Sequence, residues 1–316
     1  MPATTSPPWL EEWKSYVPGP IQVIPTLDGQ PTLLMHRLDI IQSWAEGNKY
    51  FKLKYVIRHA LENNIKVIVS KGGMFSNHLA ALSAACSRFN LRCVALIRSH
   101  GDDELNPSVR RLRDQGCEIY LLPPESYRAY GPEDARAIDP DALFIPEGGL
   151  SDLGILGASE IAAAWSAFPV THAVLAGGTM STAIGILSAV TPDITTVIVP
   201  AWKGCTPKYV RQLLEEYKKT QLENWELWPD YHFGGFGRFD HRLMESMDAF
   251  TTQHTIPLDP VYTGKMVFAV LDKIEAGYFK TTDVVMMVHT GGLQGLDGYA
   301  YRFPDVWGRY VAGIRS

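Results

Sequence analysis

The chain has 316 residues and a mass of 35.2 kDa, which is enough for two modest α/β domains or one large one. Hydrophobic residues make up 46% of it and charged residues 20%, so the chain can bury a core and is not disordered. Its 29 basic and 34 acidic residues give a net charge of −5, and no basic run is present. This balance argues against nucleic acid as a partner.

The cysteines and the apolar runs indicate where the protein works. Its four cysteines show no CxxC spacing and no paired motif, which predicts reduced thiols with no disulfide frame and no metal site. The first residues lack a basic segment followed by an apolar one, so no secretory signal is expected. No apolar run approaches the about 18 residues of a membrane span. We therefore expect a soluble cytoplasmic protein without a membrane partner, and a protein of this kind is most often an enzyme.

The first half of the chain alternates between helical and extended patterns. Residues 1–35, rich in proline and turn formers, predict an arm over the main body with a strand near residues 32–35. Residues 49–62 place apolar side chains at the spacing of a helix with one buried stripe. Short runs rich in β-branched residues then alternate with helical segments. The predicted strands are 66–70, 92–98, 118–122 and 142–145, and the predicted helices are 76–89 and 106–115.

A second alternating series begins near residue 156. It predicts helices at 156–166, 181–190, 207–219, 242–253 and 264–277, and strands at 173–176, 195–199 and 283–288. Residues 223–240 are rich in aromatics and glycine and are expected to be irregular. Strand–helix–strand spacing of this kind predicts right-handed crossovers and parallel strands. The expected fold is α/β, with two open twisted parallel-sheet domains, flanking helices and a cleft between the domains.

Ligands of parallel sheets bind where strands end and loops feed helix N-termini. One such loop holds Gly177, Gly178, Thr179, Met180, Ser181 and Thr182. Its glycines allow close approach of an anion, and backbone N–H groups and hydroxyls can donate to it, which predicts a phosphate cup. The loop matches neither GxGxxG nor GxxxxGK[ST], so dinucleotide and P-loop sites are disfavoured. The alternative is a glycine-rich turn with capping hydroxyls.

A second loop, Gly72-Gly73 followed by Met-Phe-Ser76-Asn77-His78, also joins a strand to a helix. Three polar side chains at one helix start can bind a carboxylate by hydroxyl, amide and backbone N–H together. The alternative is plain N-capping by Ser76 or Asn77. A cap accounts for one of these residues and not for three.

Lysine, tyrosine and threonine complete the candidates. Lys49 lies where a loop meets a helix, and a desolvated lysine there has a lowered pKa and can form a Schiff base. Lys52, on the same helical face, could reach a phosphate. Tyr262 precedes a helix and could act as an acid, a base or a hydrogen-bond donor. Thr290 ends a buried strand, where its hydroxyl could face a ring nitrogen. The alternatives are a solvated surface lysine and a core tyrosine.

Six segments in one order carry a resemblance: GNKYFKLKY, SKGGMFSNHLAALSAAC, IPEGG, AGGTMSTAIG, LDPVYTGK and HTGG. They resemble the pyridoxal-phosphate enzymes of the tryptophan synthase β-chain fold (fold type II). The resemblance is closer to the family of 1-aminocyclopropane-1-carboxylate deaminase and D-cysteine desulfhydrase. It covers about residues 40–295. Each piece alone is unspecific, whereas GNKxxKLxY with GGxxSNH and DPVYTGK is specific.

The resemblance implies pyridoxal 5′-phosphate as the cofactor and a role for each matching residue. Lys49 matches the lysine that forms the Schiff base, and Lys52 and the loop 177–182 match the phosphate contacts. Asn77 matches the asparagine beside the phenolic oxygen of the cofactor, and Thr290 matches the residue that faces the pyridine nitrogen.

The same resemblance implies the substrate contacts. Ser76, Asn77 and His78 match the segment that holds the substrate carboxylate, although the third residue is often glutamine in the family. Tyr262 matches the active-site tyrosine near the substrate, and Thr263 follows it. Lys49, Ser76 and Tyr262 are the residues expected to take part in catalysis.

Two positions separate members of this family. The deaminases resemble DPVYEGK, with a glutamate that can keep the pyridine nitrogen protonated, where this chain has Thr263. They also tend to have leucine in place of Thr290. A neutral hydroxyl partner weakens the electron sink, which suits β-elimination better than opening of a cyclopropane ring. Phe236, in Gly235-Phe236-Gly237, stands where the family usually has a tyrosine.

These observations predict an enzyme, a lyase that removes the β-substituent of a small amino acid. D-cysteine, which would give pyruvate, sulfide and ammonia, is the favoured substrate. Two alternatives stay open, namely 1-aminocyclopropane-1-carboxylate deamination and a cofactor-binding protein without turnover. A small substrate-binding domain (52–152) is expected to be inserted into a larger cofactor-binding domain (1–51 and 153–316). By resemblance alone, the protein is expected to be a homodimer.

Overall fold

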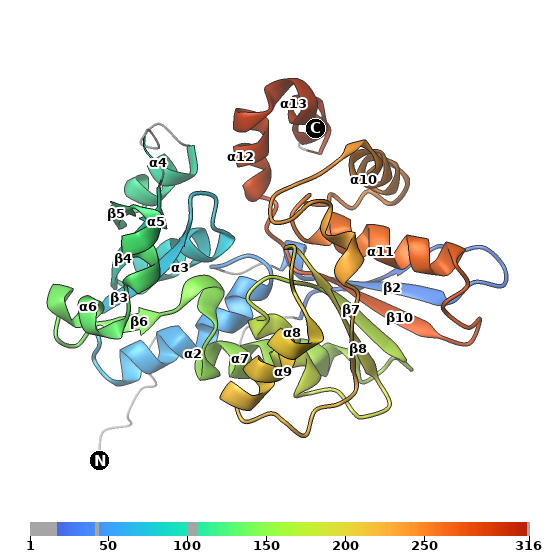
Figure 1. Ribbon diagram of the computed structural model, residues 1–316, viewed down its shortest axis with the longest axis horizontal. Coiled ribbons are helices and arrows are strands. Elements are labelled where there is room, and N and C mark those ends of the chain that lie inside the picture. Colours follow the sequence, from blue (N-terminus) through green and yellow to red (C-terminus); the bar gives the residue numbers. More distant parts are fainter. Residues whose placement is uncertain (1–17, 42–43, 100, 102–106, 315–316) are drawn as a thin grey trace, which may run out of the picture.

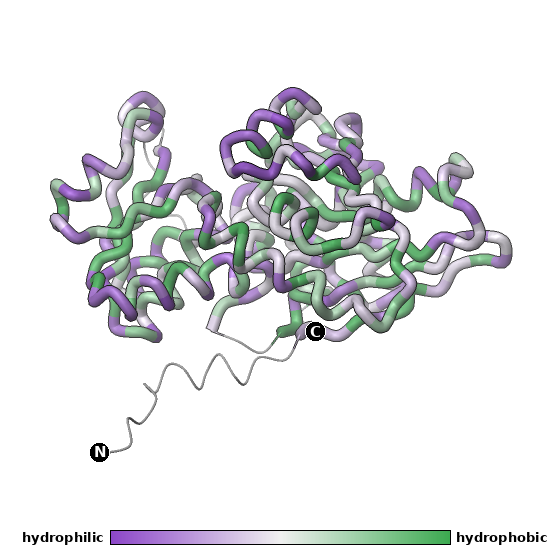
Figure 2. Tube along the Cα trace, turned by 90° about the horizontal axis from the view of Figure 1, so that it is seen from below, coloured by the Kyte–Doolittle hydropathy of each residue, from purple (hydrophilic) through white to green (hydrophobic). Residues whose placement is uncertain are grey.

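The computed structural model describes residues 18–41, 44–99, 101 and 107–314. These residues form two sheets in two lobes, flanked by helices (Figure 1). Figure 2 shows the lobes from below, with hydrophobic segments running through both. The predicted α/β class with two parallel-sheet units is confirmed. Within the described ranges, no helix is both long and apolar enough to cross a bilayer.

The smaller sheet has four parallel strands in the order β5-β4-β3-β6. Its two central strands, β3 and β4, carry valine, isoleucine and leucine that are buried on both faces, as expected for a parallel sheet covered by helices. The strands are β3 (Val67–Gly73), β4 (Arg92–Arg98), β5 (Glu118–Leu122) and β6 (Leu143–Ile145). The flanking helices are α3 (Asn77–Arg88), α4 (Pro107–Asp114), α5 (Pro124–Ala129), α6 (Pro132–Ile138) and the 3₁₀ turn η2 (Glu147–Gly149).

The larger sheet has six strands in the order β1-β2-β10-β7-β8-β9, in which only β1 is antiparallel to its neighbour. The strands are β1 (Ile21–Ile24), β2 (Thr32–Arg37), β7 (His172–Gly177), β8 (Thr195–Pro200), β9 (Trp225–Leu227) and β10 (Val284–His289). The α-helices are α2 (Asn48–Glu62), α7 (Asp152–Ser159), α8 (Ser181–Leu187), α9 (Pro207–Glu216), α10 (His241–His254), α11 (Thr263–Glu275), α12 (Gly295–Arg302) and α13 (Pro304–Gly313). The 3₁₀ turns are η1 (Leu38–Ile40), η3 (Glu160–Trp165) and η4 (Pro229–His232).

Helix α2 joins the two lobes. It packs along α7, and Gly157 makes this approach possible, because a Cβ there would lie 1.8 Å from the carbonyl oxygen of Phe51. Both the first two strands and the strands after residue 171 belong to the larger sheet. Because α2 runs through the expected boundary between residues 51 and 52, the exact domain limits stay a prediction.

Several elements differ from the sequence expectation. The helix expected at 156–166 begins earlier, as α7, because the Ser151 hydroxyl accepts the Gly154 N–H at 3.1 Å, and it continues as the 3₁₀ turn η3. Strand β9 interrupts the segment expected to be irregular and takes its extended form by pairing with β8. The patterns do not predict β1, α5, α6, α12 or α13. Residues 1–17 of the expected arm and residue 106 of the expected helix at 106–115 lie outside the described residues.

Candidate active site

Loops from the carboxyl ends of both sheets meet at one place. A Cβ added to Gly148, after β6, would lie 2.6 Å from Oγ1 of Thr179, after β7. The Ser181 hydroxyl donates to the Gly149 carbonyl at 3.2 Å. A Cβ on Gly292, after β10, would lie 2.4 Å from Nδ2 of Asn77. A Cβ on Gly149 would also lie 3.2 Å from Cε1 of His78, so the loops at 72–78, 177–182 and 289–292 are neighbours although they are far apart in the sequence.

Lys49 is held beside the end of β10. The N-cap of α2 is Gly47 with φ 63°, and a Cβ there would lie 2.1 Å from the carbonyl oxygen of Thr290, so only glycine fits. The Asn48 N–H donates to this same carbonyl at 3.1 Å. The structure thus places the two residues before Lys49 against the backbone of Thr290, which is nearly fully buried.

Asn48 links Lys49 to the phosphate cup. Lys49 Nζ donates to Oδ1 of Asn48 at 2.6 Å, and Nδ2 of Asn48 donates to Oγ1 of Thr182 at 2.8 Å. Asn48 and Thr182 are both buried, so the bond between them is shielded from water. The sequence patterns predict no role for Asn48, although its place between a glycine and the candidate lysine at a helix start is a usable signal.

Two cations lie one turn apart on α2. Lys52 is only 4% exposed, and among the described residues no carboxylate lies within ion-pair distance of it. Burial and the charge of Lys49 hold the pKa of Lys52 well below its ordinary value. Burial also lowers the pKa of Lys49 to about 8, although the Asp259 carboxylate opposes this shift. Buried ammonium groups without an anion are costly, so this arrangement favours an anionic ligand.

The partly buried Lys49, whose pKa is lowered, predicts a pH-dependent stability of the protein without ligand. Its pKa is about 8 in the fold and near 10.5 in the unfolded chain, so the unfolded chain binds more protons between these values and stability rises with pH. Below about pH 8, Lys49 is protonated in both the folded and the unfolded protein, so the full cost of burying its charge lowers the stability. Lys49→Met should therefore be more stable than the wild type. We expect its advantage to shrink by about 1–2 kcal/mol between roughly pH 8 and 9.5 in urea unfolding. A stability difference between Lys49→Met and wild type that does not change with pH would contradict a lowered pKa of Lys49.

The cup of residues 177–182 is shaped by close contacts. A Cβ on Gly178 would lie 3.1 Å from the ring of Tyr262, and Met180 takes a left-handed conformation with φ 66° before α8. The Ser181 hydroxyl donates its proton to the Gly149 carbonyl. Thr182 accepts from Asn48, so its own proton is still available for a ligand.

The start of α3 contains the predicted carboxylate segment. Ser76 is the N-cap, and its hydroxyl accepts the Leu79 N–H at 3.2 Å, which leaves its proton free to be donated. Oδ1 of Asn77 is buried and has no partner within the described structure. An unpaired buried acceptor of this kind indicates a place for a donor from a ligand.

His78 differs from its expected role. Its Nε2 lies 2.9 Å from the Ser70 hydroxyl, which itself donates to the Ile145 carbonyl at 2.7 Å, so Nε2 is the protonated nitrogen. Burial and the charges of Lys52 and Lys49 hold the pKa of His78 well below its ordinary value. The remaining Nδ1 is an acceptor beside Gly149. A neutral imidazole with a free lone pair offers a substrate carboxylate neither charge nor a proton.

Thr263 is also placed differently from the expectation. It is fully buried, and its hydroxyl donates to Oδ2 of Asp259 at 2.6 Å and accepts the Asp259 N–H at 2.8 Å. The Asp259 carboxylate also accepts the N–H groups of Val261, Tyr262 and Thr263, at 2.9, 2.8 and 3.0 Å. Asp259 and Thr263 therefore close the turn before α11 together, and the Thr263 hydroxyl is not available for a substrate. The signal for Asp259, an aspartate before proline ahead of a helix, is present in the sequence.

Tyr262 is fixed by this turn and faces the cup. Burial and the Asp259 carboxylate raise the pKa of Tyr262, so its phenol stays protonated and can donate but not act as a base. Phe236 packs edge-on against it, with ring centroids 5.9 Å apart, and is 58% exposed. The loop with the missing tyrosine thus lies next to Tyr262.

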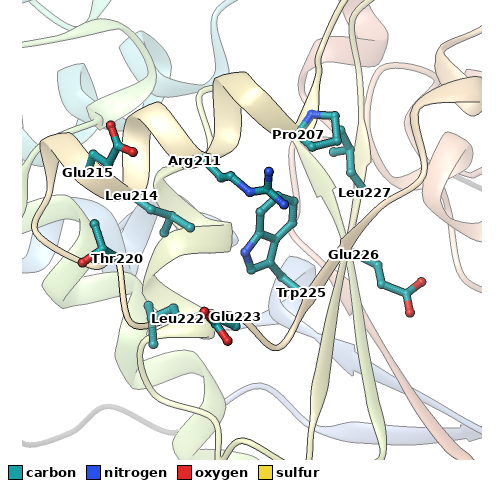
Figure 3. A pocket seen from close by; sticks show the side chains of 10 residues that line it. All are labelled: Pro207, Arg211, Leu214, Glu215, Thr220, Leu222, Glu223, Trp225, Glu226 and Leu227. Atoms are coloured by element: carbon teal, nitrogen blue, oxygen red, sulfur yellow. The ribbon is translucent and has the colours of Figure 1, made fainter.

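A separate cavity of about 720 Å³ lies along α9 and β9 (Figure 3). Its lining includes Arg211, Leu214, Glu223 and Trp225, and no residue predicted for the site. Groups of three or more histidine, cysteine or carboxylate side chains that could hold a metal are not found in the part of the chain that the structure describes.

The family model for "pyridoxal-phosphate dependent enzyme" matches residues 37–291. A D-cysteine desulfhydrase from Salmonella paratyphi A is 26% identical over 309 residues, which cover 89% of this chain and 94% of that protein. The structure of an ACC deaminase homologue aligns with a TM-score of 0.78 and 23% identity, over 96% of this chain and 100% of the other. A hydrogen sulfide-producing enzyme from Fusobacterium nucleatum aligns with a TM-score of 0.64 and 13% identity, over 87% and 96% of the two chains.

These matches confirm the two-sheet fold, the family and the cofactor expected from the motifs. The family model spans the lysines of α2, the cup and the turn after β10. The chain belongs to the family of pyridoxal-phosphate dependent enzymes.

Proposed function

We propose that this enzyme is a lyase that eliminates the β-substituent of a small amino acid, and that D-cysteine is its substrate. The observation that carries the proposal is the unneutralised pair Lys49 and Lys52 beside the cup, with Thr290 and no carboxylate at position 263. The similarity to a D-cysteine desulfhydrase over most of both chains supports the choice of substrate.

The residues at the site fit pyridoxal 5′-phosphate. Lys52 and the cup would hold its phosphate, since a buried cation without a partner needs an anion. Nδ2 of Asn77 would donate to its phenolic oxygen, and Thr290 would face its ring nitrogen. Lys49 would bind its aldehyde carbon. When bound, the cofactor supplies the electron sink for a carbanion at the α-carbon of the substrate.

The chain's own groups would bind the substrate and move its protons. Ser76 has a hydroxyl proton to donate, and it stands at the N-terminus of the 12-residue helix α3, where a carboxylate is stabilised. This clamp would fix the substrate so that the bond to be broken is aligned. Lys49, with a pKa near 8, is suited to take the α-proton close to neutral pH. Tyr262 would donate to the departing sulfur, because its phenol stays protonated.

A second candidate is deamination of 1-aminocyclopropane-1-carboxylate, which the structural likeness to an ACC deaminase homologue brings forward. Phe236 in place of a tyrosine and Thr263 in place of a glutamate disfavour it. The third alternative, binding without turnover, is disfavoured by a site that includes both a carboxylate-binding helix start and Lys49. Cytoplasmic location and a homodimer stay predictions.

A substrate panel tests the proposal. The purified protein, loaded with cofactor, is assayed for sulfide and pyruvate from D- and L-cysteine and for 2-oxobutyrate from the cyclopropane amino acid. We expect sulfide and pyruvate in equal amounts from D-cysteine. Formation of 2-oxobutyrate alone would establish the deaminase instead. Cofactor absorption without any product would favour the non-catalytic binder.

A further inference from the structure

We infer that Lys265 is a positioning residue whose ammonium group ties the end of β8 to residues 232–237, called here the Phe236 loop. Through these two segments it sets the position of the cup and of Phe236, both of which lie next to Tyr262. The inference rests on the proposed function only for its effect on substrate binding.

The ammonium group of Lys265 lies in a cage of backbone carbonyls. Its side chain is fully buried, and Nζ donates to Ala201 at 3.1 Å, to His232 at 2.9 Å and to Gly235 at 2.9 Å. The three protons of an ammonium group are thus all used. No carboxylate pairs with it in the described structure, although the charge of Asp259 is felt there. Burying a cation lowers the stability of the fold, so we infer that the role of this ammonium group is to connect the segments that it binds.

On one side, this cage reaches the cup. Ala201 follows β8, and its own N–H donates to the Gly177 carbonyl at 2.8 Å. The next residue, Trp202, donates its indole N–H to the Gly178 carbonyl at 3.1 Å. Because Gly178 lies against the ring of Tyr262, fixing Ala201 also fixes the surface of the cup that faces this ring.

On the other side, the cage holds the Phe236 loop. This loop has no strand or α-helix, and Gly234, Gly235 and Gly237 have φ of 88°, 127° and 69°, conformations that other residues rarely adopt. Its ties outside itself include Lys265, and the bond from the Tyr299 hydroxyl to the Gly237 carbonyl at 2.9 Å. We infer that these ties hold the exposed Phe236 ring in its contact with Tyr262.

Loss of the ammonium group should therefore loosen this loop while the cofactor stays bound. Hydrogen exchange of peptides covering residues 230–239 is measured in cofactor-loaded wild type, Lys265→Met and Lys265→Ala. We expect exchange at least about tenfold faster in both variants, since three hydrogen bonds from a charged donor are lost. The KM for D-cysteine should rise about tenfold and the visible absorption of the cofactor should remain.

Chemical rescue separates the charge from packing. In Lys265→Ala, n-propylammonium replaces the missing carbons and the ammonium group, and 1-propanol is its neutral counterpart. We expect the cation to restore slow exchange and a low KM and the alcohol to restore neither. Lys273→Met, on the same helix but outside the cage, is the control and should behave as wild type.

Three results would overturn the inference. Unchanged exchange in both variants would show that the Phe236 loop does not depend on Lys265. Equal rescue by the alcohol would show that the side chain acts by packing. Global unfolding of Lys265→Met, instead of local loosening, would make Lys265 a general core residue. A wild type without activity on D-cysteine would refute the proposed function, and the exchange measurement would still decide the role of Lys265.

Discussion

Lys49→Ala should lower the turnover of D-cysteine by at least about 10²–10⁴-fold, the usual contribution of a positioned acid–base group alone. The variant loses both the nucleophilic amine that would hold the cofactor and the base for the α-proton. Among the described residues, no other lysine donates to Asn48, the residue that is bonded to Thr182 of the cup. Pyruvate and sulfide release, together with the visible spectrum, measure the loss.

Two further variants make this result specific. Lys49→Arg keeps a cation at the site but offers no amine that can be deprotonated, so it should be as inactive as the alanine variant. Lys54→Ala lies on the same helix but removes the ion pair with Glu160 at 2.6 Å, away from the cup, and should keep activity. Turnover by Lys49→Ala within tenfold of the wild type would refute the role of Lys49.

Lys52→Met should have opposite effects on the protein with and without its cofactor. Without the cofactor, the ammonium group is buried and unpaired, so methionine should raise the free energy of unfolding, by about 1–4 kcal/mol. With the cofactor, the same change removes the partner of a buried phosphate. Loss of one member of a buried charge pair costs about 2 kcal/mol or more, which raises the dissociation constant of the cofactor roughly 30-fold.

Denaturant unfolding of the cofactor-free protein and titration with cofactor measure these two effects. Lys54→Met is again the control, because its ammonium group is paired with Glu160 and partly exposed. A Lys52→Met protein that is less stable without cofactor, or that binds cofactor as tightly as wild type, would place the phosphate elsewhere.

The alternation of strands and helices was sufficient to predict both sheets, because each strand–helix unit carries its own local pattern. The same alternation also predicts that the loop after β7 lies close to the residue after β10, since parallel strands end at the same edge of a sheet. The elements that the patterns do not predict depend on tertiary pairing. Strand β9 is three residues long and is defined by its bonds to β8, and Gly298 in α12 is buried against the ring of Phe75.

The partners of the polar site residues account for the remaining differences. Spacing shows that Thr263 and His78 lie near the site, but not that Asp259 and Ser70 already use their polar groups. The patterns predict no role for Asn48 or Lys265, because the acceptors of these side chains come from segments more than 25 residues away. Side chains whose function is to join distant segments cannot be recognised before the fold is known.

Reduction of the cofactor-loaded protein with borohydride, followed by peptide mapping, tests the site most directly. The reagent makes the bond between the cofactor and its lysine permanent. The alternatives to Lys49 are Lys52 and Lys265, the other described lysines whose pKa is lowered by burial. Our account predicts the added mass of the cofactor on the peptide that contains Lys49, and on Lys49 itself after fragmentation. The added mass on Lys52 or Lys265, or on no lysine at all, would contradict it.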